Sequence, residues 1–462
     1  MNNFTKIITV LIYILTCPSV FAQQLGKSES LIVNMLDEDK AFHSVDQDVF
    51  ENLGWDVPDQ GRAVKAIADK APGNAFDPRT LEALDPKTIG YKPTWHEVRY
   101  QKYGLDWDIT GLHLMPENPV RGLPTMVIVH GGANNFYNFF VNPLNEPGVG
   151  QYLAQKIPVL LVSIPGNYRH GGWLEAPSER EMGYLLDGDM SSDEIKVRNA
   201  AYTFQLVMDG VVELIEEAVD GDFVLVGHST GGELPYMLHG SRLKDRMHGR
   251  ILGWATGGTS HLTSMQDRWG YTRTAADYPP VDEVRGRPTS DYSGAYMGPL
   301  NPVWDDSKSP EEVAQRWMDE LVFQRRPRIK QVLQDVERRG ATPGMREGVI
   351  KQVHSVLENE GSRYNVDVDA VLADLFAPMR APLTGYSKIV LTAAEMDTGH
   401  WTKDNPEASS TYQVVQELRV YNPDIQVEAL MFDLPMTHQG HIERPRQLAG
   451  GLFASLIWLL KE

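Results

Sequence analysis

The chain of 462 residues is long enough for one large domain with an insertion, or for two or three smaller domains. Hydrophobic residues make up 42% and charged residues 23%, which excludes disordered, coiled-coil and collagen-like chains. The formal net charge of −19 argues against a nucleic-acid partner, because phosphate contacts need cationic side chains.

The first 22 residues are typical of a signal peptide. Lys6 supplies a positive charge, Ile7–Thr16 is a short apolar stretch, and Val20 and Ala22 suit a small-residue cleavage site. This stretch is too short to span a bilayer as a helix, and no later apolar run is long enough, so we predict no membrane span. We therefore expect an exported protein, either periplasmic or secreted.

Cys17 is the only cysteine, and it lies inside the predicted signal peptide. The chain from Gln23 onward therefore has no disulfide. Its scattered histidines give no metal-ligand spacing, so we predict neither a metal site nor a cofactor. Attachment of a lipid to Cys17 is an alternative, although Leu15 and Thr16 are bulkier than such a site prefers.

Residues 23–94 are polar with scattered Pro and Gly, and we interpret them as an N-terminal extension that wraps the main domain. Strand-like runs follow at Trp95–Lys102 and Ile109–Met115. From Leu123, short apolar runs alternate with helix candidates, which is typical of a parallel sheet covered on both faces. The buried-strand runs are Thr125–His130, Pro158–Ser163, Asp222–Gly227, Ile251–Ala255, Ser387–Ala394 and Gln426–Phe432.

Four helices are predicted between and after these runs. Asn135–Lys156 can hold a helix, and Ser191 with Glu194 forms a capping box for a long helix that runs to about Val219. Another helix follows the Asp222–Gly227 strand and runs to about Arg242. Pro445–Lys461 is the closing helix.

The alternation stops near Thr259 and resumes at Ser387. Residues 260–383 begin with a loop rich in Tyr, Pro and Gly and continue as helix candidates, for example Pro310–Phe323 and Arg328–Arg339. The simplest account is one α/β domain with a mostly parallel, doubly wound sheet formed by residues 95–259 and 384–462. Residues 260–383 would then be a helical cap insertion.

One motif carries the chemistry. Gly227-His228-Ser229-Thr230-Gly231 fits G-x-S-x-G and lies between an apolar strand and a helix, which is the context that exposes a nucleophilic serine. The glycines allow a tight turn in which a Cβ would clash. The helix directs its N-terminal N–H groups toward the Ser229 hydroxyl. A glycine-rich turn of no catalytic use is the alternative.

With these features the chain resembles the α/β-hydrolase superfamily of serine hydrolases, in particular esterases and lipases with a cap insertion. The resemblance covers roughly residues 95–260 and 384–462, and it implies the chain order nucleophile, acid, histidine. It implies that the acid follows the strand after the cap, where Asp397 matches and Glu395 is the reserve candidate.

The resemblance also implies a histidine after the last strand, five residues before the glutamate of Glu443-Arg444-Pro445. This spacing selects His438, with His441 as the reserve candidate. His438 would activate the Ser229 hydroxyl, and Asp397 would hold its tautomer.

Two backbone N–H groups should form the oxyanion hole. One is that of Thr230, and the other is that of Gly132 in His130-Gly131-Gly132-Ala133, which resembles the H-G-G motif although Ala133 departs from H-G-G-G. His130 can equally serve the loop backbone, and the aromatic residues of the insertion can equally pack it onto the body. The residues that we expect near the substrate are His130, Gly131, Phe136, His228, Trp269 and Tyr271.

The sequence therefore predicts an exported serine hydrolase that cleaves small-molecule carboxylic esters. The aromatic residues of the insertion favour an aromatic or sugar-bearing ester. Acyl transfer, or hydrolysis of an amide or C–C bond with the same triad, is one alternative. A catalytically inactive binding protein with a hydrolase fold is another. The sequence does not indicate an oligomeric state.

Overall fold

A computed structural model gives the structure of the chain. It describes residues 25–58, 78–131, 136–141, 147–165, 191–238, 241–255, 343–375, 386–394, 397, 411, 412, 415, 418, 419, 424–434, 436, 438 and 440–461.

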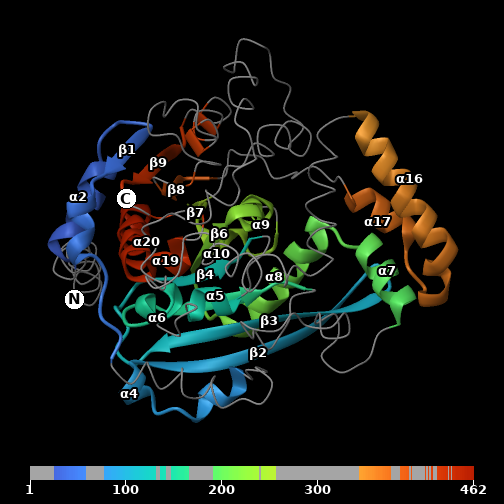
Figure 1. The fold of residues 1–462 in the computed structure, drawn as a ribbon, viewed down its shortest axis with the longest axis horizontal. Coiled ribbons are helices and arrows are strands. Elements are labelled where there is room, and N and C mark those ends of the chain that lie inside the picture. The colour runs from blue at the N-terminus through green and yellow to red at the C-terminus, as the bar shows by residue number, and fades with distance from the viewer. Residues whose placement is uncertain are drawn as a thin grey trace, which may run out of the picture.

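Nine strands of the described residues form one sheet in the order β1-β9-β8-β7-β6-β4-β5-β3-β2 (Figure 1). The strands are Phe42–Val45 (β1), Tyr91–Lys102 (β2), Leu105–Pro116 (β3), Thr125–Val129 (β4), Val159–Ser163 (β5), Phe223–His228 (β6), Arg250–Trp254 (β7), Lys388–Ala394 (β8) and Gln426–Phe432 (β9).

From β1 to β5 in this order all neighbouring strands run parallel, whereas β3 pairs antiparallel with both β5 and β2. The predicted mostly parallel sheet is therefore confirmed. All six predicted buried-strand runs form strands, because strands covered on both faces are apolar at nearly every position. Strand β2 begins at Tyr91, earlier than the predicted start at Trp95.

Helices cover both faces of the sheet, and the core consists of two large apolar clusters. Successive residues of a strand point to opposite faces. In β6, Leu225 joins the cluster under α8, whereas Val224 and Val226 join the cluster under α20. The helices are Lys27–Leu36 (α2), Pro86–Ile89 (α4), Phe136–Phe140 (α5), Val149–Leu153 (α6), Ser192–Ala200 (α7), Phe204–Ala218 (α8), Leu234–Leu238 (α9), Lys244–Met247 (α10), Pro343–Glu360 (α16), Val368–Leu375 (α17), Gly440–Glu443 (α19) and Pro445–Leu460 (α20), with 3-10 segments Gln47–Asn52 (η1), Pro78–Ala83 (η4), Ser229–Glu233 (η6) and Gly361–Tyr364 (η9).

The N-terminal extension contributes a strand to the sheet, which the sequence analysis did not predict. Strand β1 pairs parallel with β9, with Phe42 opposite Ala429. Helix α2 packs beside α20 on the same side of the molecule (Figure 1), and its Ile32, Val33 and Leu36 are buried in the core. A four-residue strand among polar residues gives too short an apolar pattern to be recognised.

The long helix predicted from Ser191 to Val219 is wrong, because the structure has two helices there. Ser191 caps α7 as expected, with the Glu194 N–H 3.2 Å from its Oγ. The chain then leaves the helical conformation, and Thr203 caps α8 by accepting a hydrogen bond from the Leu206 N–H at 3.0 Å. A side-chain acceptor at an extended residue starts a new helix more readily than it continues the old one.

Two other predicted helices are also shorter than expected. The described part of residues 135–156 contains two short helices, α5 and α6. Gly148, which precedes α6, packs against the end of α5: its N–H donates to the Phe140 carbonyl oxygen at 2.8 Å, and a Cβ there would lie 2.6 Å from the Phe139 carbonyl oxygen. The helix after Ser229 begins as the 3-10 segment η6, continues as α9 and ends at Leu238 rather than Arg242.

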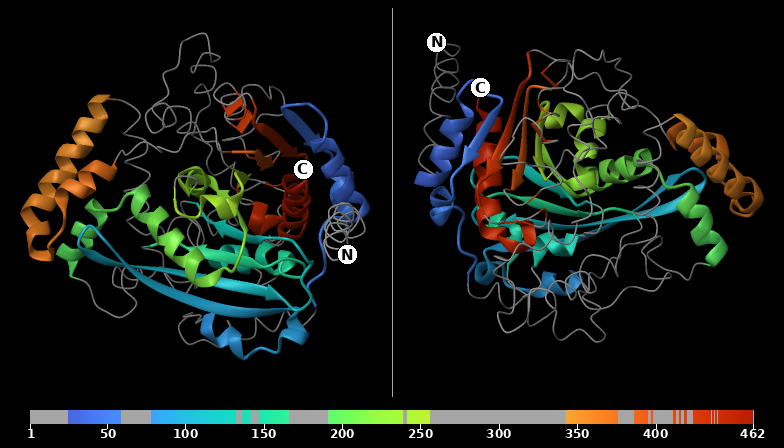
Figure 2. Two further views of the ribbon diagram at one scale, coloured as in Figure 1. Left: turned by 180° about the vertical axis from the view of Figure 1, so that it is seen from behind. Right: turned by 45° about the horizontal axis from the view of Figure 1, so that its top comes forward.

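Helices α16 and α17 are the described part of the predicted cap insertion. Figures 1 and 2 place them at the opposite end of the molecule from α2 and α20. The helix candidates Pro310–Phe323 and Arg328–Arg339 and the predicted signal peptide lie outside the described residues. None of the helices in the described part of the chain is long and apolar enough to cross a membrane.

The packing of α2 against the core predicts that substitutions at two adjacent residues change stability by different amounts. Ile32 is fully buried, whereas Leu31 is 44% exposed. Replacing Ile32 with Ala should lower the free energy of unfolding by about 2–5 kcal/mol through lost burial and a cavity. Leu31→Ala is the matched control and should change it by no more than about 0.5 kcal/mol. Urea unfolding of the two variants checks this, and equal stabilities would contradict the docking of the extension.

Candidate active site

The predicted functional residues lie at the carboxyl ends of neighbouring strands. Ser229 follows β6 directly, and His130 and Gly131 follow β4, the neighbour of β6. Asp397 follows β8, and His438 follows β9. The carboxyl ends of parallel strands share one edge of the sheet, which is where open α/β sheets bind ligands.

Ser229 has a strained backbone. Its φ is +52°, a left-handed conformation that residues other than Gly rarely adopt. A Cβ on Gly227 would lie 2.4 Å from the Gly232 Cα, and one on Gly231 would lie 2.6 Å from the His130 carbonyl oxygen. The glycines of the motif therefore serve the close turn that the sequence analysis expected.

His438 and Asp397 are a buried pair. The Nδ1 of His438 lies 3.0 Å from Oδ2 of Asp397, and the residues are 5% and 1% exposed. At this distance Nδ1 donates its hydrogen to the carboxylate, which leaves Nε2 as the atom that can accept a proton. This is the relation between histidine and acid that a catalytic triad needs.

His441, the reserve candidate for the histidine, has different surroundings. Its ring stacks on Phe139 with centroids 4.2 Å apart and planes 8° apart, and it is fully buried. Burial, with a smaller contribution from His438, lowers the pKa of His441 well below its usual value. The structure thus brings His438 to Asp397 and places His441 behind it in an aromatic stack.

The loop after β4 lies against Ser229. A Cβ on Gly131 would be 2.4 Å from the Ser229 Cβ and 2.7 Å from the His228 carbonyl oxygen. Only glycine allows the backbone of this loop to approach Ser229 this closely. Thr230 is in η6, which begins at Ser229. Gly132 lies outside the described residues.

His228, expected near the substrate, is fully buried. Its Nδ1 accepts a hydrogen bond from the Gly131 N–H at 3.3 Å, and its Nε2 lies 3.2 Å from the His438 carbonyl oxygen. Burial lowers the pKa of His228 well below its usual value, and the nearby His441 and His438 lower it further. The side chain therefore faces the protein interior.

Two more residues that were expected near the substrate make their contacts inside the protein. His130 is 1% exposed and forms backbone hydrogen bonds, with Nδ1 2.9 Å from the Gly131 carbonyl oxygen and Nε2 3.4 Å from the Ile164 N. Phe136 is 1% exposed and packs on Trp95, with ring centroids 5.1 Å apart. The remaining predicted residues, Glu395, Trp269 and Tyr271, lie outside the described part of the chain.

The sequence profile of the "Alpha/beta hydrolase family" matches residues 126–449, well over half of the chain. The chain belongs to the alpha/beta hydrolase family. The fold agrees with this family, and so does the predicted resemblance. A search of curated proteins returns no match to this hydrolase.

Solved structures with a similar fold come from several hydrolases. A protein described as a probable hydrolytic enzyme from Pseudomonas aeruginosa is 16% identical, with a TM-score of 0.41, over 84% of this chain and 99% of that one. Brefeldin A esterase, a bacterial homologue of human hormone sensitive lipase, is 14% identical, with a TM-score of 0.33, over 94% of this chain and 91% of that one. A haloalkane dehalogenase variant from Bradyrhizobium elkanii is 13% identical, with a TM-score of 0.38, over 79% and 96%.

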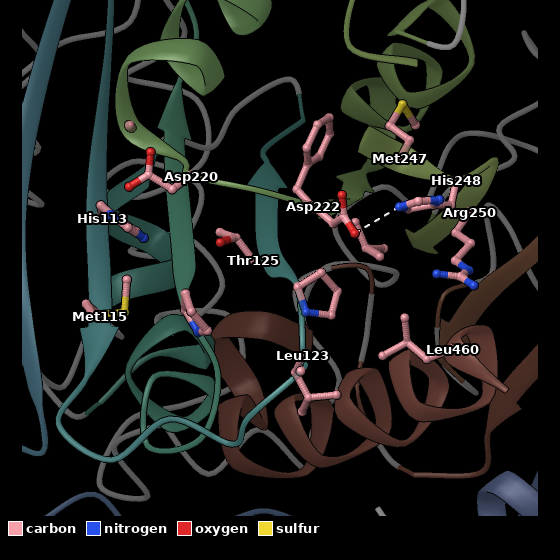
Figure 3. A pocket seen from close by; sticks show the side chains of 16 residues that line it. His113, Met115, Leu123, Thr125, Asp220, Asp222, Met247, His248, Arg250 and Leu460 are labelled. Carbon is pink, nitrogen blue, oxygen red and sulfur yellow. Dashed lines mark ion pairs between the residues drawn. The ribbon is translucent and has the colours of Figure 1, made fainter. Parts of the chain in front are cut away.

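The other end of the hydrolase sheet holds a cavity of about 360 Å³ (Figure 3). Its lining includes Thr125, Phe223 and Arg250, which begin β4, β6 and β7, so it lies away from Ser229. An ion pair of 2.9 Å joins His248 to Asp222 at this cavity, as Figure 3 shows. Among the described residues, no group of three or more His, Cys, Asp or Glu side chains could hold a metal ion.

The close approach of the β4 loop to Ser229 predicts that even a methyl group at position 131 destabilises the fold. Gly131→Ala should lower the free energy of unfolding by about 1–3 kcal/mol, because the backbone must shift to relieve the overlap. Gly361→Ala is the matched control, since a Cβ there would meet its nearest atom at 3.5 Å, an ordinary contact. Urea unfolding compares the two variants, and a Gly131→Ala protein as stable as the control would disprove the close approach.

The lowered pKa of His113, which lines the cavity, predicts that the stability of the fold depends on pH. Burial, with a smaller contribution from His96, lowers the pKa of His113 to about 4 from 6.5. Between these pH values the unfolded chain binds the proton and the folded chain does not. Stability is therefore complete above pH 6.5 and falls by roughly 3 kcal/mol as the pH drops toward 4.

His113→Phe removes this titrating group. The variant should lose about 3 kcal/mol less than the wild type between pH 7 and pH 4. Urea unfolding at several pH values measures the difference. Identical pH dependence of the two proteins would rule out a His113 that stays neutral in the folded chain.

Proposed function

We propose that this member of the alpha/beta hydrolase family is a serine hydrolase that cleaves carboxylic esters through an acyl-enzyme. The observation that carries the proposal is the buried pair of His438 and Asp397, with 3.0 Å between Nδ1 and Oδ2. Asp397 follows β8 and His438 follows β9. Both therefore lie at the sheet edge where Ser229 occupies a strained turn. A structural serine does not need such a turn, but a nucleophile does.

The first half of the reaction transfers the acyl group to the protein. The Ser229 hydroxyl oxygen attacks the ester carbonyl carbon, while Nε2 of His438 takes the hydroxyl proton. Asp397 accepts the hydrogen bond from Nδ1 and stabilises the imidazolium that forms. The tetrahedral intermediate then collapses, and the alcohol leaves with the proton that His438 returns to it.

The second half restores the enzyme. Water attacks the acyl carbon, His438 takes one proton of the water, and the Ser229 oxygen leaves with that proton. The products are a carboxylic acid and an alcohol, and no co-reactant other than water is needed. The same histidine thus acts as base and then as acid in each half.

Two backbone N–H groups would stabilise the oxyanion, those of Thr230 and Gly132. Thr230 follows Ser229 directly in η6, and the Gly131 backbone beside Ser229 brings the β4 loop to the same point. Such donors act where charge develops, and removal of one costs about 3–4 kcal/mol of barrier in comparable enzymes. An aromatic or sugar-bearing ester, bound with help from Trp269 and Tyr271, remains the proposed substrate class.

We also propose that the protein is exported. The support is the sequence of residues 1–22, with a positive charge, a short apolar stretch and small residues before Gln23. A periplasmic or extracellular enzyme of this class would act on small-molecule esters outside the cytoplasm.

The test is hydrolysis of p-nitrophenyl esters of increasing acyl length by the wild type and Ser229→Ala. The variant should lose about 10⁴- to 10⁶-fold in kcat, because no other group replaces the nucleophile, while its Tm stays within a few degrees of the wild-type value. A fluorophosphonate should label the wild type and leave Ser229→Ala unlabelled. Equal turnover by both proteins would disprove the assignment of Ser229.

The histidines supply a matched comparison. His438→Gln should lose activity almost as completely as Ser229→Ala, because the general base is gone. His441→Gln keeps the base and should lose about tenfold or less in kcat, through altered packing of the loop. The opposite order of the two variants would transfer the role of base to His441. Labelling without ester turnover would point to amides or acyl transfer, and no labelling to a binding protein.

A further inference from the structure

We infer that His228 is a positioning residue, which joins the loop after β4 to the loop that carries His438 through its two ring nitrogens. This inference rests on the proposed function, because it explains how the groups named there are held together. His228 itself touches neither the ester nor the reacting atoms. Its role is to fix the backbone on both sides of Ser229.

The two hydrogen bonds determine where the proton of the ring lies. The Gly131 N–H can only donate, so the Nδ1 atom 3.3 Å away must be the unprotonated acceptor. The His438 carbonyl oxygen can only accept, so the Nε2 atom 3.2 Å away must carry the hydrogen. A neutral imidazole with its proton on Nε2 meets both requirements, whereas the other tautomer and the cation do not.

The surroundings favour this neutral form. His228 is fully buried, and its ring centroid lies 4.9 Å from that of His438, 4.6 Å from that of His441 and 5.6 Å from that of Phe139. Burial and these neighbouring imidazoles lower the pKa of His228. A second charge beside His438 would oppose the imidazolium that forms during catalysis, so a permanently neutral ring suits the reaction.

The bridge connects three strand ends that are far apart in the chain. His228 is the last residue of β6, Gly131 follows β4, and His438 follows β9. His438 is therefore held at two points, by Asp397 at Nδ1 and by His228 at the carbonyl oxygen. The hydrogen bond to His228 also occupies the Gly131 N–H.

Side-chain amides can separate the two hydrogen bonds. Asn places a polar atom near the position of Nδ1 and reaches no further, so His228→Asn keeps an acceptor for Gly131 and loses the bond to His438. Gln reaches the position of Nε2, so His228→Gln keeps a donor for the His438 carbonyl and loses the acceptor for Gly131. His228→Leu loses both and keeps a comparable volume.

The test measures kcat and KM for p-nitrophenyl acetate, together with Tm, for these three variants. His228→Leu should lose about 100-fold in kcat with KM within about twofold of the wild type, because misplacement of the reacting groups affects the chemical step. His228→Asn and His228→Gln should each recover about tenfold of this loss. His354→Gln, at a half-exposed histidine of α16, is the control and should match the wild type.

A loss of kcat in His228→Leu that the two polar variants do not partly restore would overturn the inference, because only packing would then be at stake. Wild-type kcat in all three variants would overturn it as well. If His228→Leu does not fold, His228→Asn and His228→Gln still decide, since each should lose about tenfold in kcat at an unchanged KM.

A second measurement does not depend on catalysis. In ¹⁵N spectra of the histidine rings, protonated and unprotonated nitrogens resonate far apart, and the signal of His228 is the one absent from His228→Gln. At pH 7 it should show a proton on Nε2 alone. A proton on Nδ1, or on both nitrogens, would overturn the bridge. If the wild type hydrolyses no ester and binds no fluorophosphonate, the proposed function fails, while this spectrum still tests the tautomer.

Discussion

The backbone of Gly131 lies directly against the side chain of Ser229, and the arrangement of the candidate site depends on this close approach. Neighbouring parallel strands end side by side, but side chains normally keep their following loops apart. Here glycines at positions 131, 227 and 231 remove the atoms that would intervene. The backbone of the β4 loop therefore contacts Ser229, and the ring of His228 spans from one loop to another.

Much of the fold could be predicted from the sequence because parallel strands leave a strong local signal. Thr125–Val129 and Phe223–His228 are buried at every position, so their apolar runs stand out without any knowledge of their neighbours. The same holds for the turn at Ser229, since its glycines, its strand and its helix are contiguous. Asp397 and His438 depended on resemblance to a family, because residue type alone does not distinguish His438 from His441.

The remaining features depend on contacts between distant residues. Thr203 caps the start of α8, and its hydroxyl also lies 2.7 Å from the hydroxyl of Tyr103, a distant residue that no local pattern connects to it. His228 was expected near the substrate, but its ring forms hydrogen bonds with the backbone of two other loops. Local patterns predict elements, whereas burial and partners across the fold decide what each polar side chain does.

The pairing of β1 with β9 has a consequence for how the molecule is made. These two strands come from opposite ends of the chain, and β9 is flanked on its other side by β8 (Figure 1). Strand β1 must therefore wait until β9 has been synthesised before the two can form their hydrogen bonds. Pairing of such high contact order can form only after β9 has been synthesised. Strand β1 can therefore join the sheet only once β9 is present. In a chain truncated before β9, β1 would lack its parallel partner.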